Sequence, residues 1–374
     1  MLDSLKRIEA AGSADTLREA MAECHPELAA EGGPNRIAIV GAADEGRRLA
    51  ELCVANGVEV VAHCDDNPAK VGTEIAGRTV EPTSALEKLD DGTVVIVASH
   101  RPMRAYERLR ALGVKAYAQF MVLQVLRPDL YPPHMFYDGW LEDLVENLDQ
   151  YKWLAETLAD DTSRAHLDAI LRYRLTGSLD EILDIIDWEV YQPKGLIAFD
   201  EHEVYVDGGA YDGDTIKLFI DRVGGKFDGV VAFEPDPDTY GRLCDNFSDE
   251  PRVKPVNKGL FSEETTLRFT NDMHRASIIA DDGEIEIQCC GLDDVLGGDR
   301  ATFIKMNIEG AELEALRGAK RTIDAWKPRL GISAYHRPTD LWGVPRRILE
   351  VRGDYALYLR QQDAGVIETV CYAI

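Results

Sequence analysis

The feature that most constrains the fold is a short apolar segment ending in a glycine-rich turn, and it occurs twice. The first copy is RIAIV followed by GAADEG at residues 36–46, and the second is VYV followed by DGGAYDG at residues 204–213. Short apolar runs are typical of strands buried in a parallel sheet. Small residues then allow a tight turn into a helix whose N–H groups face a ligand crevice. Each copy therefore predicts the start of a βαβ unit.

Strand-like and helix-like segments alternate after both turns, a pattern typical of open parallel sheets. We therefore predict an α/β fold with two tandem Rossmann-like domains. The expected division of the chain is N-terminal helices at 1–30, a Rossmann-like domain at 31–125, a helical linker at 126–200 and a second α/β domain at 201–374.

The second domain has the clearer strand pattern. Strands are expected at 203–206, 230–234, 252–256, 301–306 and 329–334. The terminal runs YALYLRQQ and GVIETVCYAI fit an antiparallel hairpin. Before this domain, residues 120–139 are rich in aromatic residues and proline, and we expect an irregular connector there.

The two glycine turns differ in charge. Asp207, Asp212 and Asp214 surround the second turn, where they would repel a pyrophosphate and attract a cation. S-adenosylmethionine (SAM) carries a sulfonium and an α-ammonium group, so it suits this turn better than NAD does. Glu234 follows Gly213 by 21 residues, close to the interval at which an acid reaches ribose hydroxyls.

The turn and the next strand end therefore supply the predicted cofactor contacts. These are Asp207, Gly208, Gly209, Ala210, Gly213, Asp214, Thr215, Glu234 and Pro235. The alternative is a tight strand–helix turn that binds no ligand.

Several motifs beyond this turn agree in order and spacing with a known family. They are VDGGAYDGDT, FEPDP, NKGLFS (257–262), IKMNIEGAELEALRGA (304–319) and ISAYHRPTDLW (332–342). From about Arg164 to its end, the chain resembles the FkbM family of SAM-dependent methyltransferases. The resemblance implies a class I methyltransferase fold with a mainly parallel seven-stranded sheet. It also implies methylation of hydroxyl oxygens on natural products or glycans.

One residue departs from the family pattern. Members often have Asp where this chain has Asn307, and an amide cannot accept a proton as a carboxylate does. Glu309 and Glu312 remain, three residues apart on one side of a helix start. Contact with the substrate or a metal ion, and helix capping, are both open for these acids. We take Asn307 and Glu309 as candidate catalytic residues, and Asn307 also as a cofactor contact.

Tyr335, His336 and Arg337 follow the expected strand LGISA, at the edge where open α/β sheets bind ligands. An imidazole has a suitable pKa for a general base toward a hydroxyl group. We therefore predict His336 as the catalytic base, with a structural histidine as the alternative. Tyr335 and Arg337 are predicted to contact the substrate.

The first domain repeats the nucleotide-binding pattern. Asp65 follows Gly46 by 19 residues, and Arg101 follows the third apolar run, where it could pair with a phosphate. The stretch VVAHCDDNPAKVGTEIAGRTV resembles the N-terminal Rossmann-like domain of sugar O-acyltransferases, which implies a nucleotide-sugar ligand. Gly41, Gly46, Asp65 and Arg101 are the predicted contacts. A packing or dimerisation domain without ligand and an NAD-binding oxidoreductase domain are the alternatives.

Composition narrows the partners. A formal net charge of −26 argues against binding nucleic acid or an anionic membrane. The seven cysteines include no CxxC pair, so we expect reduced thiols and predict no metal site. No apolar run approaches the ~20 residues of a membrane span, and no signal peptide is visible. A cytoplasmic protein is expected, and whether it forms homo-oligomers is open.

The leading hypothesis is a SAM-dependent methyltransferase acting on a hydroxyl of a sugar, glycan or natural product. One alternative is a non-catalytic subunit that binds SAM or a nucleotide sugar, as Asn307 suggests. The other is a nucleotide-sugar oxidoreductase or epimerase centred on residues 36–120. The identity of the acceptor, the choice of O- or N-methylation and metal dependence stay open.

Overall fold

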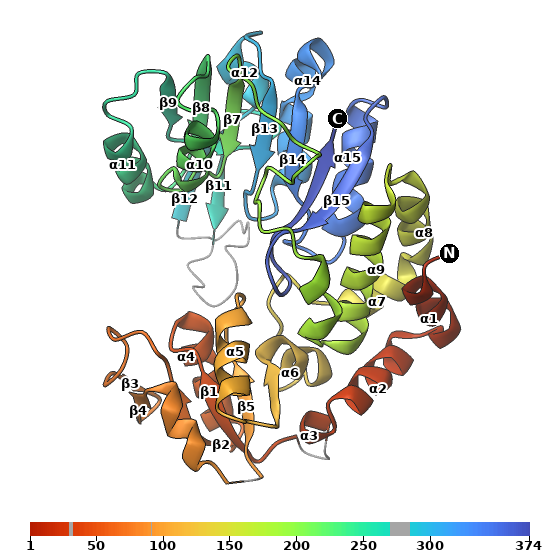
Figure 1. Ribbon diagram of the computed structural model, residues 1–374, viewed down its shortest axis with the longest axis vertical. Helices are drawn as coiled ribbons and strands as arrows, with labels where there is room; N and C mark the ends of the chain where they lie inside the picture. Colours follow the sequence, from red (N-terminus) through yellow and green to blue (C-terminus); the bar gives the residue numbers. More distant parts are fainter. Residues whose placement is uncertain (30–32, 91, 270–284) are drawn as a thin grey trace.

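The computed structural model describes residues 1–29, 33–90, 92–269 and 285–374, and it contains two large sheets (Figure 1). The expected boundary between residues 30 and 31 lies outside the described residues. The N-terminal sheet has the strand order β3 (Glu74–Ile75), β4 (Arg78–Glu81), β2 (Glu59–Cys64), β1 (Arg36–Val40), β5 (Val94–Val97) and β6 (Tyr117–Gln119).

This N-terminal sheet is parallel except for its β3–β4 edge. Its central strand β1 is buried from Ile37 to Val40 because β2 and β5 flank it and helices cover the faces. The connecting helices are α4 (Asp44–Ala55), the 3-10 helix η1 (Thr83–Lys88) and α5 (Met103–Ala111). The strands that follow β1 lie first on one side of it (β2 and β4) and then on its other side (β5 and β6). Open α/β sheets form a ligand crevice at such a switch in strand order.

The expectation of an irregular connector at 120–139 is wrong for its first seven residues. Helix α6 (Phe120–Leu126) follows β6 directly, and every one of its residues is buried. A helix buried on all sides has no polar face, so its sequence FMVLQVL lacks the periodicity that reveals most helices.

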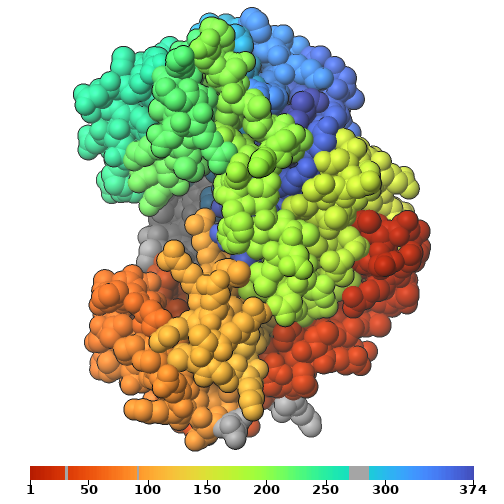
Figure 2. Space-filling model, viewed as in Figure 1, coloured from red at the N-terminus to blue at the C-terminus, as the bar shows by residue number. Residues whose placement is uncertain are grey.

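Helices from distant parts of the chain form one layer beside the sheets. They are α1 (Asp3–Ala11), α2 (Ala14–Cys24), α3 (Pro26–Ala29), α7 (Trp140–Glu146), α8 (Leu148–Thr157) and α9 (Asp161–Thr176). Ser4 donates hydrogen bonds to Asp168 through its backbone N–H (3.1 Å) and its hydroxyl (2.7 Å). Figure 2 shows the N-terminal helices, in red, side by side with the yellow-green middle helices. Between α9 and the first strand of the next sheet, the described residues contain two short 3-10 helices, η2 (Leu179–Glu181) and η3 (Leu183–Ile185).

The C-terminal sheet has the predicted seven strands. Their order is β15 (Leu357–Gln361), β16 (Thr369–Ala373), β14 (Arg329–Ser333), β13 (Phe303–Met306), β7 (Val204–Gly208), β8 (Gly229–Phe233) and β9 (Val253–Val256). The five strands from β14 to β9 are parallel, and β16 pairs antiparallel with both β14 and β15. The mainly parallel sheet and the terminal hairpin are thus confirmed.

The remaining elements surround this sheet. They are α10 (Asp214–Arg222), α11 (Pro237–Asn246), β10 (Gly259–Leu260), β11 (Thr265–Phe269), β12 (Ile285–Cys290), α12 (Leu292–Leu296), α13 (Glu312–Gly318), α14 (Lys320–Trp326) and α15 (Asp340–Val351). Strands β10, β12 and β11 form a small separate sheet. None of the helices in the described part of the chain is long and apolar enough to cross a membrane.

Candidate active site

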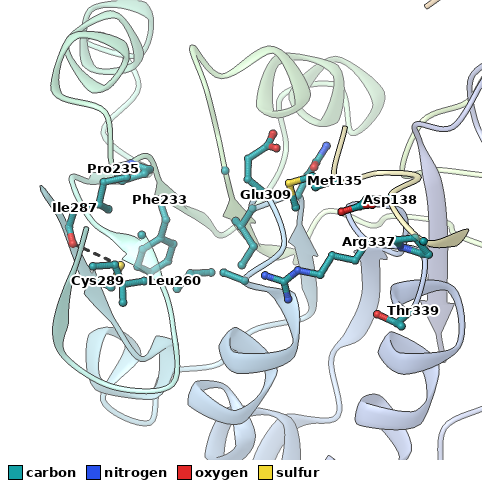
Figure 3. A pocket seen from close by; sticks show the side chains of 18 of the residues that line it. Met135, Asp138, Phe233, Pro235, Leu260, Ile287, Cys289, Glu309, Arg337 and Thr339 are labelled. Atoms are coloured by element: carbon teal, nitrogen blue, oxygen red, sulfur yellow. Dashed lines mark hydrogen bonds between the residues drawn. The ribbon is translucent and has the colours of Figure 1, made fainter. Parts of the chain in front are cut away.

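The carboxyl ends of β7, β8 and β13 open into a cavity of about 830 Å³. Apolar side chains, including Phe233, Leu260, Ile287 and Cys289, gather at one end (Figure 3). Asp138 and Thr339 lie at the other end (Figure 3). Glu309, Met135 and the guanidinium group of Arg337 lie between the two ends (Figure 3). The acidic lining residues are Asp138, Glu142, Asp143, Glu146, Glu234 and Glu309. The cavity therefore combines an apolar end with a strongly acidic end.

The turn after β7 requires glycine because of contacts within the protein. Gly209 has φ +74°, and a Cβ atom there would lie 2.0 Å from the backbone oxygen of Asn307. Gly213 has φ +88°, and a Cβ atom there would lie 2.1 Å from the ring of Phe247. Both glycines allow the turn to pack tightly against neighbouring elements.

Asp207 forms an ion pair beneath this turn. Its side chain is fully buried, and one carboxylate oxygen lies 2.7 Å from Nζ of Lys305, a buried residue of β13. The same Nζ donates to the backbone oxygens of Gly208 (3.2 Å) and Gly209 (2.8 Å). Thr215 donates its hydroxyl to the other oxygen of Asp207. Burial raises the pKa of Asp207, against the opposing effects of Lys305 and Thr215.

Lys305 is a site residue that the sequence reasoning missed. The one signal in the sequence that could have indicated its role is that it is a charged residue inside an otherwise apolar strand, FIKM. Lys305 balances the charge of Asp207, which is buried and does not line the cavity. The carboxylates that reach the cavity belong to other residues.

Glu234 is the acid that reaches the cavity at the end of β8. One of its oxygens accepts the backbone N–H of Tyr211 (3.0 Å), and the other accepts that of Asp236 (2.9 Å). Burial raises the pKa of Glu234, while the two backbone hydrogen bonds oppose this shift. The carboxylate thus anchors the turn while it faces the cavity.

The predicted cofactor contacts fall into two groups. Those lining the cavity are Gly209, Glu234, Pro235 and Asn307. Those outside the lining, at the end of β7, in the turn or at the start of α10, are Asp207, Gly208, Ala210, Gly213, Asp214 and Thr215. The roles of both groups in binding remain predictions.

The turn between β13 and α13 forms the middle of the cavity. Asn307 accepts a hydrogen bond on Oδ1 from the hydroxyl of Tyr335 (3.2 Å). Glu309 has φ +55°, a region that non-glycine residues rarely adopt, and its side chain is 63% exposed. Glu309 lines the cavity, and one of its carboxylate oxygens lies 3.9 Å from Nε2 of His336.

His336 lies behind the cavity rather than in it. Its side chain is fully buried, and Nδ1 lies 3.0 Å from a carboxylate oxygen of Glu312. Burial lowers the pKa of His336, but Glu312 and then Glu309 outweigh burial and raise it to about 9. An imidazolium without access to the cavity cannot take a proton from a substrate at neutral pH. This geometry argues against the predicted base and in favour of the structural alternative.

The predicted nucleotide contacts of the first domain do not all come together. Asp65 accepts the backbone N–H of Ala42 (2.8 Å), which ties the end of β2 to the turn from Gly41 to Gly46. Arg101 instead lies near the β15–β16 connection, 3.3 Å from Glu368 and 3.4 Å from Asp363. The other predicted substrate contact, Tyr335, is buried beside Asn307, and Arg337 lines the cavity.

Comparison with known proteins identifies the class of this domain. Residues 207–363 match the family described as the methyltransferase FkbM domain. The fold, the glycine turn and this match define the C-terminal domain as a methyltransferase domain of the FkbM family. The resemblance seen in the sequence is thus confirmed for this part of the chain. The resemblance of the first domain to sugar O-acyltransferases lies outside these residues and stays a prediction.

Two relatives extend the comparison. The crystal structure of methyltransferase FkbM from Methylobacillus flagellatus KT is similar at 27% identity and a TM-score of 0.74, over 100% of this chain and 99% of that chain. Hexuronic acid methyltransferase AglP from Haloferax volcanii is 31% identical over 106 residues, which is 26% of this chain and 43% of that protein. The chain therefore matches less than half the length of this curated relative.

The buried ion pair should matter greatly for stability. Replacing Lys305 with Met leaves the carboxylate of Asp207 buried and uncompensated, so the free energy of unfolding should fall by about 3–5 kcal/mol. Urea denaturation measures this loss. The control is Lys320→Met, because Lys320 and Asp324 form an exposed pair that contributes at most about 1 kcal/mol. Equal losses in the two variants would contradict the assignment.

The buried histidine predicts a pH dependence of stability. The pKa of His336 is raised to about 9 in the folded protein, from the ~6.5 of a free histidine. The charged His336 therefore contributes its full stabilisation below pH ~6.5, and this contribution is lost as the pH rises through 9. Burial also raises the pKa of Asp340, to about 7, which adds a loss in the same direction at lower pH.

The free energy of unfolding should therefore fall between pH 6.5 and 9 in the wild type and change much less in His336→Gln. Denaturation at a series of pH values measures both curves. His202→Gln, at an exposed histidine, should behave as the wild type does. A wild-type curve that is flat over this window would exclude the charged pair.

Proposed function

We propose that the protein is a SAM-dependent methyltransferase that methylates an oxygen atom of a sugar-containing acceptor. The observation that carries this proposal is that one cavity has both an apolar end beside Glu234, which suits a nucleoside, and an acidic end, which suits a polyhydroxyl acceptor. The methyltransferase FkbM domain at residues 207–363 supports the reaction class.

The apolar end fits the cofactor. Phe233, Leu260 and Ile287 offer a surface for a purine ring, and Glu234 stands at the strand end where acids accept ribose hydroxyls. Bound SAM supplies a methyl group already activated by its sulfonium, so the protein has mainly to align the acceptor and receive its proton.

The acidic end fits hydroxyl groups. Glu142, Glu146 and Asn147 bring carboxylate and amide oxygens that accept hydrogen bonds from sugar hydroxyls. Glu309 lies between the two ends of the cavity and is accessible, so we assign it the proton-accepting role in place of His336. Asn307, held by Tyr335, orients groups at the junction of the two ends.

Arg337 suggests that the acceptor carries a carboxylate near the middle of the cavity, where the guanidinium group lies (Figure 3). It is the only basic side chain among the described residues that line the cavity, and its guanidinium forms no ion pair or hydrogen bond with any of them. A guanidinium pairs well with a carboxylate in bidentate geometry. The relative AglP is named for hexuronic acid, an acidic sugar, which supports the same acceptor class. The first domain is the proposed place for a nucleotide or glycan part of this acceptor.

Calorimetry with SAM tests the cofactor assignment. The wild type should bind SAM, and Glu234→Gln should raise the Kd about tenfold, because it weakens a charge-assisted hydrogen bond. Glu264→Gln is the matched control, since Glu264 is exposed and pairs with Lys258 outside the cavity. A wild type that does not bind SAM would overturn the proposal.

Paired acceptors test the role of Arg337. With labelled SAM, kcat/KM for a glucuronic acid conjugate should exceed that for the matched glucose conjugate. Arg337→Gln should lower the first value about tenfold and leave the second nearly unchanged, because only the carboxylate pairs with the guanidinium. Arg321→Gln, on exposed α14, should change neither value. Equal losses for both acceptors in Arg337→Gln would refute this role.

A further inference from the structure

We propose that Glu45, His100 and His134 bind a divalent transition-metal ion, most suitably Zn²⁺, at the carboxyl edge of the N-terminal sheet. One ligand atom from each of these side chains lies within 4.8 Å of the others. Glu45 is in the first turn of α4, His100 follows β5, and His134 lies between α6 and α7. The three residues lie outside the lining of the methyltransferase cavity, and the inference does not depend on the proposed function.

The donor set selects the kind of ion. Two imidazole nitrogens and one carboxylate oxygen are typical of zinc sites with three protein ligands and one open position. Mg²⁺ and Ca²⁺ prefer all-oxygen surroundings. The side chains of Glu45 and His100 are 16% and 23% exposed, so an ion can enter from solvent. His134 is buried and closes the inner side of the site.

The polar atoms of this group lack good partners in the protein. Nε2 of His100 lies 3.8 Å from Glu45, beyond hydrogen-bond distance, and its Nδ1 is buried without a hydrogen-bond partner in the described part of the chain. The ring of His134 accepts one long contact, 3.3 Å, from the backbone N–H of Phe136. Leaving buried polar groups unsatisfied is costly. A bound cation would satisfy several of them at once.

Arg48 supports the site from behind. Its Nη1 lies 3.7 Å from one oxygen of Glu45, which leaves the other oxygen to face His100. Its Nη2 donates to the backbone oxygen of Pro132, two residues before His134. Arg48 therefore positions two of the three ligands, as surrounding groups do in metal sites.

A second group of similar composition, Glu312, His336 and Asp340, is buried throughout, whereas Glu45 and His100 are partly exposed to solvent. One oxygen of Glu312 accepts the backbone N–H of Ile308 (2.8 Å) and lies 3.0 Å from His336. Asp340 accepts the backbone N–H of Arg337 (2.8 Å). This group is an internal ion pair, so it serves as a control for the proposed site.

The proposed ion would connect the two domains. His134 directly precedes Met135, which lines the cavity, and the ring of Phe136 lies 5.1 Å from that of His100 and 5.6 Å from that of Tyr335. An ion on His134 would hold this segment, and with it the acceptor end of the cavity, against the N-terminal sheet.

The test uses the full, untagged chain after chelator treatment. Calorimetry with Zn²⁺, elemental analysis and the visible spectrum of bound Co²⁺ should all give one ion per chain, and Zn²⁺ should raise the Tm. Glu45→Gln, which conserves shape at an accessible position, and His134→Asn should each weaken Zn²⁺ binding at least tenfold and remove the rise in Tm.

His336→Gln and His202→Gln should bind Zn²⁺ as the wild type does. The far-UV circular dichroism of each variant shows whether it is folded, and folded Glu45→Gln alone suffices for the test. Failure of the wild type to take up one ion per chain would overturn the proposal. So would unchanged binding in Glu45→Gln, or loss of binding in His336→Gln.

Discussion

The ammonium group of Lys305 holds together the ends of the strands that build the cavity. It contacts the carboxylate of Asp207 and two backbone oxygens of the turn after β7, and it comes from β13, the neighbouring strand. Taking two charges out of water costs several kcal/mol, so such a pair is favourable only when further hydrogen bonds satisfy it. Thr215 and the backbone oxygens of Gly208 and Gly209 provide them.

The other parts of the site depend on this locked turn. Gly209 passes so close to Asn307 that the positions of the two turns are coupled. Glu234 accepts the N–H of Tyr211 from the same turn, which links the end of β8 to it. The charged pair of His336 and Glu312 then holds the β13–α13 turn against the segment that carries Arg337. Buried charged pairs thus position the turns that surround the cavity, while other, accessible side chains face into it.

Much of the fold could be predicted because parallel strands buried on both faces leave short apolar runs in the sequence. The strands of the C-terminal sheet and its terminal hairpin follow from such runs. Helix α6 could not be predicted in this way, because it is buried on all sides and shows no periodicity. The packing of α1 and α2 against α7–α9 could not be predicted either, because contacts between distant segments leave no local pattern in the sequence.

By itself, the sequence determined the α/β class, the glycine turns and the family of the C-terminal domain, because these depend on local patterns and on motif order. Only the tertiary structure decided which charged groups face the cavity. Asp207 and His336 are both buried against partners from other segments, Lys305 and Glu312, whereas Glu234, Glu309 and Arg337 reach the cavity. The same holds for Glu45, His100 and His134, which are separated by 55 and 34 residues in the chain. A side chain's charge and reactivity depend on its burial and its neighbours, and these are properties of the folded chain.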